Sequence, residues 1–155
     1  MPNPYIKEVA VRYTRRRLKT PDSLIGAPLH SAREVAHLFR FLADEPRETL
    51  VVVHIDGRNT LTTWERISVG SSTTSIAHPK SVFQAALLKD ACAVVLIHNH
   101  PSGKPDPSAE DDAITARMAA CGHLMGIPLL DHVVVASDGY YSYRESNPDL
   151  LEAGS

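Results

Sequence analysis

Two histidines and an aspartate in the middle of the chain have the residue types and spacing of metal ligands. His98 and His100 lie two positions apart at the end of an apolar run, residues 91–97. Because side chains alternate along a strand, both imidazoles point to one face, with their Cα atoms about 7 Å apart. Pro101 removes a backbone donor and ends this strand, and Asp111 follows a proline-rich loop at the predicted start of a helix. The three side chains can therefore converge on one cation.

Two histidines and one carboxylate leave the fourth position of a tetrahedral zinc ion open, which is the composition of a catalytic site. Zinc lowers the pKa of its water toward about 7, so that hydroxide becomes available at neutral pH. The reaction also needs a general base. Glu48, just before the apolar run 50–55, is chemically suitable, but Glu45, Glu65 and Glu110 satisfy the spacing equally well.

Each part of this pattern also has a purely structural explanation. A His-x-His pair at a strand end can simply face solvent. Ser108 and Asp111 form an ordinary helix start, in which the hydroxyl caps the helix and the acid lies near its positive end. The two roles of Asp111 are compatible because a carboxylate has two oxygens. The metal hypothesis rests on the combination of in-phase histidines, a rigid turn and an acid at a helix entrance.

The motif His-x-His-Pro-x6-Ser-x2-Asp resembles that of the JAMM (MPN+) metalloproteases. It is formed here by His98, His100, Pro101, Ser108 and Asp111. The longer segment HNHPSGKPDPSAED, with ETLVVVHID, ACAVVLIHNH and GIPLLDHVVVA, is similar to the RadC branch of that superfamily. The resemblance covers roughly residues 30–145.

This resemblance implies a site, a fold and an activity. His98, His100 and Asp111 would bind Zn²⁺, Ser108 would stabilise the oxyanion, and Glu48 would act as general acid and base. The implied fold is α+β, of the MPN (cytidine-deaminase-like) type, in which a mixed β-sheet lies between helices in three α/β/α layers. The implied activity is that of a zinc metallopeptidase or isopeptidase acting on a peptide or protein substrate.

Two other functions stay open. The chain could be a non-catalytic RadC-like binding module in DNA repair or in mobile-element processes, or a metal-dependent nuclease. Asn99 stands where deubiquitinating members carry Ser or Thr, which argues against ubiquitin-type specificity. The helix-hairpin-helix segment of full-length RadC proteins is not recognisable in residues 1–29, which argues against DNA binding by that route.

Composition favours one ordinary globular domain. The 155 residues are 43% hydrophobic and 22% charged, with a formal net charge of −2, which excludes a disordered tail, a disulfide scaffold and a general attraction to nucleic acid. We expect a basic arm and connector over residues 1–29, a RadC-like JAB/MPN domain over 30–145 and a polar tail over 146–155. In the arm, Arg15, Arg16 and Arg17 offer a weak nucleic-acid contact or simply a solvated segment.

No membrane segment or signal peptide is recognisable, since the longest apolar run is residues 91–97. Cys92 and Cys121 lie among small and apolar residues and are predicted to be buried, reduced thiols. A cytoplasmic protein without a membrane partner is therefore expected.

Hydrophobic periodicity predicts the elements that hold the motif. Strands are expected near residues 49–55, 61–69, 91–97, 127–136 and 140–143, and helices over 31–43, from Pro79, and over 108–121 with an end at Gly122. Asp131 and His132 lie in one of these strands, either as a buried hydrogen-bonded pair or in a role that orients a metal ligand. His54 is expected to be a satisfied core histidine or a partly exposed one.

Overall fold

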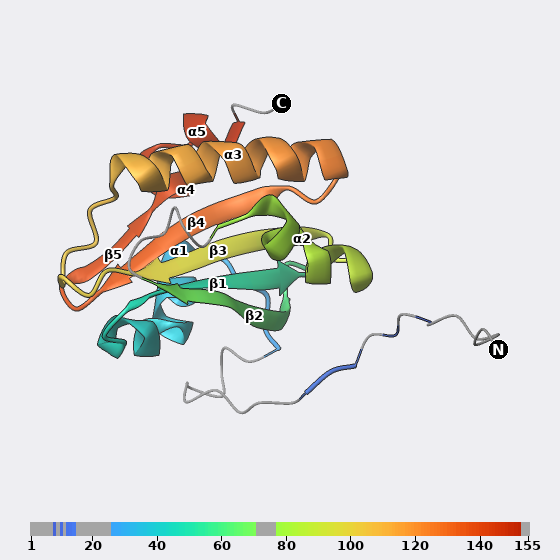
Figure 1. Ribbon diagram of the computed structural model, residues 1–155, viewed down its shortest axis with the longest axis horizontal. Coiled ribbons are helices and arrows are strands. Elements are labelled where there is room, and N and C mark those ends of the chain that lie inside the picture. Colours follow the sequence, from blue (N-terminus) through green and yellow to red (C-terminus); the bar gives the residue numbers. More distant parts are fainter. Residues whose placement is uncertain (1–7, 9, 11, 15–25, 71–76, 153–155) are drawn as a thin grey trace, which may run out of the picture.

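Five strands form one mixed sheet in the computed structural model, which describes residues 8, 10, 12–14, 26–70 and 77–152. The strands are β1 (Glu48–Ile55), β2 (Leu61–Gly70), β3 (Ala93–Asn99), β4 (Leu129–Ala136) and β5 (Gly139–Ser142). Their order across the sheet is β2-β1-β3-β4-β5 (Figure 1). β3 and β4 are parallel, and the other neighbours are antiparallel. The crossover between the parallel strands carries a helix, as such a connection requires.

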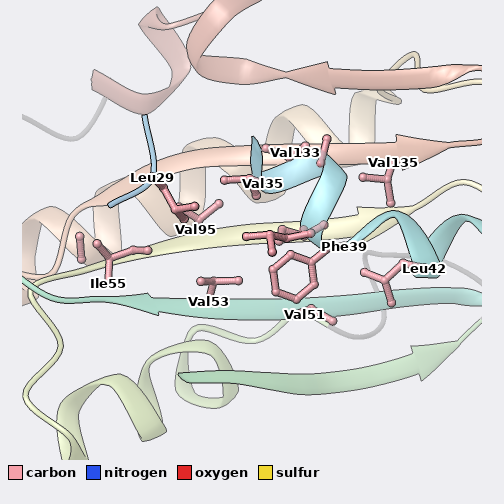
Figure 2. Packing of buried hydrophobic residues seen from close by; sticks show 14 residues of the cluster. Leu29, Val35, Phe39, Leu42, Val51, Val53, Ile55, Val95, Val133 and Val135 are labelled. Carbon is pink, nitrogen blue, oxygen red and sulfur yellow. The ribbon is translucent and has the colours of Figure 1, made fainter. Parts of the chain in front are cut away.

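Helices cover both faces of this sheet, which explains why its central strands are apolar on both sides. On one face, α1 (Ala32–Leu38) and the short 3-10 helix η2 (Arg40–Asp44) pack on Val51, Val53 and their neighbours (Figure 2). On the other face, α2 (Pro79–Leu88) and α3 (Ala109–Met125) pack on Leu50, Val52 and theirs. The α+β fold with a mixed sheet flanked by helices is thereby confirmed.

Two predicted helix ends are wrong. The helix expected over 31–43 is divided at Phe39, where α1 ends and η2 begins. The helix expected to end at Gly122 continues to Met125 and ends at Gly126, whose left-handed φ of 69° suits glycine. Gly122 is needed for close packing instead, because a Cβ at that position would overlap the carbonyl oxygen of Ile127.

Two short helices lie at and within the start of the segment expected to be a polar tail, residues 146–155. α4 (Tyr143–Ser146) follows β5 directly, because Ser142 accepts a hydrogen bond from the backbone of Glu145 and caps the helix. α5 (Asp149–Glu152) follows, and Leu151 packs against the apolar cluster beneath α3. The segment 143–152 therefore contributes to the fold.

Three other predictions concern the surface. Cys121 is half-buried and Cys92 is exposed, so the expectation that both thiols are buried is wrong, although both are free. Arg15, Arg16 and Arg17 lie outside the described residues, and their nucleic-acid contact stays a prediction. Among the described helices, none is long and apolar enough to cross a membrane.

Candidate metal centre

The two histidines and the aspartate meet at the carboxyl end of β3. His98 is buried in the strand, and His100 follows its last residue; their Nε2 atoms lie 2.9 Å apart. The Asp111 carboxylate faces both rings, with Oδ1 3.3 Å from Nε2 of His98 and Oδ2 3.2 Å from Nε2 of His100. One ligand atom from each residue lies within 4.8 Å of the others. The period-two geometry inferred from the sequence thus brings these side chains together.

Asp111 reaches this position because it belongs to the capping box of α3. The Ser108 hydroxyl accepts a hydrogen bond from the Asp111 amide at 3.2 Å, and the Ser108 amide donates to Asp111 Oδ2 at 2.8 Å. These reciprocal bonds fix the first turn of the helix, and they leave Oδ1 facing His98 while Oδ2 also lies near His100. The capping role predicted for Asp111 is therefore compatible with a position beside both candidate histidines.

The loop between His100 and α3 is held in place by its own backbone. His100 Nδ1 donates to the carbonyl oxygen of Lys104 at 3.0 Å, and the Gly103 amide donates to the His100 carbonyl oxygen at 3.1 Å. The Gly103 carbonyl oxygen in turn accepts from the Asp138 amide at 3.0 Å, in the turn after β4. Gly103 has a φ of 89°, which glycine adopts without strain. The exposed Lys104 therefore contributes its backbone to the site.

The unsatisfied atoms of the cluster fit a divalent cation. Asp111 is almost fully buried, and its Oδ1 has no hydrogen-bond partner among the described residues. Burial raises the pKa of Asp111, but the imidazoles of His100 and His98, together with the Ser108 amide, outweigh it and hold the pKa well below its usual range, so this carboxyl stays ionised. The hydrogen bond to Asp111 correspondingly raises the pKa of His100 against the effect of burial. Two imidazole nitrogens and one carboxylate oxygen are a suitable donor set for zinc, and this group can hold a metal.

Glu48 approaches the cluster from the neighbouring strand. Leu50 pairs with His98 in the antiparallel register of β1 and β3, and Glu48 precedes Leu50 by two residues, as His100 follows His98 by two. The negative charge of Glu48 contributes to the raised pKa of His100, as expected for two groups that lie near one another. Sequence spacing did not distinguish Glu48 from three other glutamates, and of the four only Glu48 contributes to the raised pKa of His100.

Those three glutamates are placed differently. The Glu45 carboxylate lies 3.2 Å from the Arg66 guanidinium, in an ion pair. Glu65 lies in β2, across from Val52 and beyond β1 as seen from β3. Glu110 is exposed in the first turn of α3.

The Asn99 side chain hydrogen-bonds the backbone at the start of β1, a role that sequence reasoning missed. Its Oδ1 accepts a hydrogen bond from the Thr49 amide at 2.7 Å, and its Nδ2 donates to the carbonyl oxygens of Arg47 at 3.1 Å and Glu45 at 3.3 Å. The side chain is fully buried, so these bonds are shielded from water. The backbone around Glu48 is thereby tied to the residue between the two histidines. An amide that bonds across two strands has no local sequence signal.

A second layer of side chains lies behind His98. The His98 Nδ1 atom lies 2.7 Å from Nε2 of His132, and Nδ1 of His132 lies 2.7 Å from the Thr115 hydroxyl. Thr115 donates to the backbone carbonyl oxygen of Asp111, also at 2.7 Å. Burial lowers the pKa of His132, which stacks on the ring of Tyr143 with 5.3 Å between ring centroids.

Asp131 and His132 do not form a side-chain pair. As neighbours in β4 they point to opposite faces of the sheet, and Asp131 Oδ1 accepts from the backbone amides of His132 and Arg144. Asp131 Oδ2 accepts from the Ser142 hydroxyl at 2.6 Å. Both interpretations left open agree with this geometry: the two residues are buried and joined by a hydrogen bond from the His132 amide, and the His132 ring contacts a candidate ligand.

Comparison with known proteins places this arrangement in a family. The family model described as "RadC-like JAB domain" matches residues 29–148, which include all the site residues discussed above. The chain belongs to the RadC-like JAB domain family. A UPF0758 protein of Pelobacter propionicus is 41% identical over 138 residues, which cover 88% of this chain and 58% of that protein. A UPF0758 protein of Methanosarcina acetivorans is 34% identical over 137 residues, covering 88% of this chain and 60% of that protein.

This RadC-like JAB domain spans about three-fifths of the length of those relatives. The similarity supports the fold and the predicted family. Because the relatives are longer, the activity and partners of a whole protein of this kind are matters for proposal.

Proposed function

We propose that this chain is a zinc-dependent hydrolase that cleaves a peptide or isopeptide amide. One observation carries the proposal: two imidazole nitrogens and a buried carboxylate with an unpartnered oxygen converge beside the strand end that carries Glu48. The reaction class comes from the resemblance to JAMM metalloproteases. A catalytic rather than structural site is supported by the absence of cysteine from the cluster.

The residues of the site have complementary roles in this proposal. Zinc, when bound, supplies a coordinated water with a pKa near 7 and polarises the substrate carbonyl. Glu48 takes a proton from the attacking water and delivers it to the leaving amine. Ser108 Oγ already accepts a hydrogen bond from the Asp111 amide, so its own proton can be donated to the carbonyl oxygen as negative charge develops. His98, His100 and Asp111 hold the metal.

Replacing Glu48 separates metal binding from turnover. Glu48→Gln keeps the size of the side chain and removes its basicity, so we expect bound zinc to stay stoichiometric while hydrolysis falls by about 10²–10⁴-fold. Zinc is measured by elemental analysis after purification under reducing, chelator-free conditions. Hydrolysis is measured on a panel of peptide and isopeptide substrates. Glu110→Gln is the matched control, since Glu110 is exposed in the first turn of α3, and it should change neither quantity.

Two results would contradict the proposal. If the wild-type protein binds no zinc under these conditions, the hydrolase assignment is wrong. If zinc binds and only nucleic acid is cleaved across a mixed substrate panel, the alternative of a metal-dependent nuclease replaces it. Equal loss of turnover in the Glu48 and Glu110 variants would remove Glu48 from the mechanism.

A further inference from the structure

We propose that His132 is a positioning residue that sets the ring tautomer of His98, so that the Nε2 atom of His98 carries a lone pair for the metal. The inference rests on the metal site of the proposed function and does not depend on peptide hydrolysis. It follows from the directions of three consecutive hydrogen bonds behind the site.

The directions are determined from the far end of this chain of bonds. The backbone carbonyl oxygen of Asp111 can only accept a hydrogen bond, so the Thr115 hydroxyl donates its single proton to that oxygen. The bond between Thr115 and His132 must then be donated by Nδ1 of His132. His132 therefore carries a proton on Nδ1.

The opposite nitrogen of His132 faces His98. His132 is fully buried, and the partners of its two ring nitrogens are the neutral Thr115 hydroxyl and the His98 ring. A second proton would place an imidazolium in the interior without an anionic hydrogen-bond partner, which is costly. Nε2 of His132 is thus an acceptor. His98 must donate from Nδ1, which leaves its Nε2 unprotonated.

The other histidine ligand reaches the same state by a simpler route. His100 Nδ1 donates to the backbone carbonyl oxygen of Lys104, so in the neutral ring its Nε2 is also unprotonated. The two lone pairs face one another across 2.9 Å, beside the Asp111 carboxylate. Such an arrangement of acceptors needs a cation or a proton between them.

Both ends of the chain of bonds lie on candidate ligand residues. It begins at the His98 ring in β3 and ends at the Asp111 backbone in α3, with His132 of β4 between them. Because the carbonyl oxygen of Asp111 cannot take up a proton, this series of hydrogen bonds does not deliver protons to the site. It orients His98 and fixes the spacing of strand and helix, and outer partners of this kind typically account for about 10–100-fold in metal affinity.

The first test measures the tautomers directly in the metal-free full chain. Long-range ¹H–¹⁵N correlation spectra of histidine-labelled protein at pH 8 should show His98 and His132 protonated at Nδ1 alone. Observation of His98 protonated at Nε2 alone would overturn the inference. This measurement requires neither zinc binding nor turnover, so it separates failure of the inference from failure of the proposed function.

The second test measures zinc affinity by competition titration. His132→Leu removes the acceptor and should weaken zinc binding by about 10–100-fold. His132→Gln offers an amide oxygen in place of Nε2 and should stay within about threefold of the wild type by rescuing the bond from His98. The matched control is His54→Leu, because His54 is also buried beside a threonine hydroxyl but lies outside the cluster.

Thr115 provides an independent test if His132→Leu does not fold. Thr115→Val keeps the shape and removes the hydroxyl, so His132 loses the acceptor that sets its own tautomer, and His98 should appear as a mixture of tautomers. Thr115→Ser should restore the single Nδ1-protonated form. Unchanged zinc affinity in a folded His132→Leu variant, or equal loss in His54→Leu, would refute the positioning role.

Discussion

Two buried histidines lie beside threonine hydroxyls in this molecule, and their hydrogen bonding differs. His132 has a partner on each ring nitrogen, 2.7 Å away in both cases, and these bonds lead to two candidate ligands. His54 in β1 has one partner, the Thr63 hydroxyl of β2, at 2.8 Å. Its other nitrogen, Nε2, is buried without a hydrogen-bond partner in the described part of the chain.

The contrast shows that burial next to a hydroxyl does not by itself make a functional network. Thr63 also accepts a hydrogen bond from the Lys89 ammonium group at 2.6 Å, so the cluster around His54 places a positive charge near an imidazole. Burial and then this charge lower the pKa of His54 to about 4. A fully paired network orients its members, whereas a partly paired one reduces stability. Four predictions distinguish the two regions.

The largest effect is expected on metal binding. Asp111→Ala and His100→Ala each remove a ligand and should weaken zinc binding by more than the roughly 100-fold limit for outer partners. Thr63→Val, in the cluster around His54, should leave zinc affinity unchanged. Isothermal titration calorimetry on variants shown to be folded measures this difference. If Asp111→Ala or His100→Ala retained wild-type zinc affinity, the candidate ligands would not differ from the cluster around His54 in metal binding.

The next effect is a pH dependence of stability that originates at His54. The native pKa of about 4 lies below the ordinary 6.5, so between these values the unfolded chain binds the extra proton. Stability from this group is complete above pH 6.5 and is lost as the pH falls toward 4, by at most about 3 kcal/mol. Urea unfolding at several pH values should show a shallower loss for His54→Leu than for the wild type. Parallel curves for the two proteins would contradict the prediction.

Replacing each histidine by leucine should change stability in different directions at pH 8 without metal. His132→Leu removes two hydrogen bonds and leaves the His98 Nδ1 proton unpaired in the interior, which should lower the free energy of unfolding by about 2 kcal/mol. His54→Leu replaces a buried ring that has an unpartnered nitrogen, and we expect no loss or a gain of up to about 1 kcal/mol. Chemical denaturation measures both values. A similar loss of unfolding free energy in both variants would show that the difference in hydrogen bonding between His132 and His54 does not affect stability.

The smallest effect extends the comparison to helix starts. Ser108 caps α3 at the metal centre and Ser31 caps α1 on the opposite face of the sheet, each accepting from the backbone amide three residues later. Ser108→Ala and Ser31→Ala should each lower the free energy of unfolding by about 1 kcal/mol. Thermal unfolding of the metal-free variants provides the measurement. A much larger loss for Ser108→Ala would mean that its role in the metal-free fold exceeds capping.

Local sequence patterns predicted the parts of the site that depend on neighbouring residues. Alternation along β3 put His98 and His100 on one face, and the helix-start pattern put Asp111 near them. The end of α3 was missed because two glycines competed, and sequence does not reveal that Gly122 is needed for close packing while Gly126 adopts the left-handed conformation. The helix at residues 149–152 has no local signal of this kind, because Leu151 packs against an apolar cluster formed by distant elements.

Residue types and short spacings alone therefore determined the candidate ligand set and the family resemblance that implied the α+β class, because strand alternation and helix capping act over a few residues. Tertiary structure alone brought the charge of Glu48 near His100, placed His132 against His98 and tied Asn99 to the start of β1. These contacts join strands far apart in the chain, and their register is set by the packing of the whole sheet between its helices.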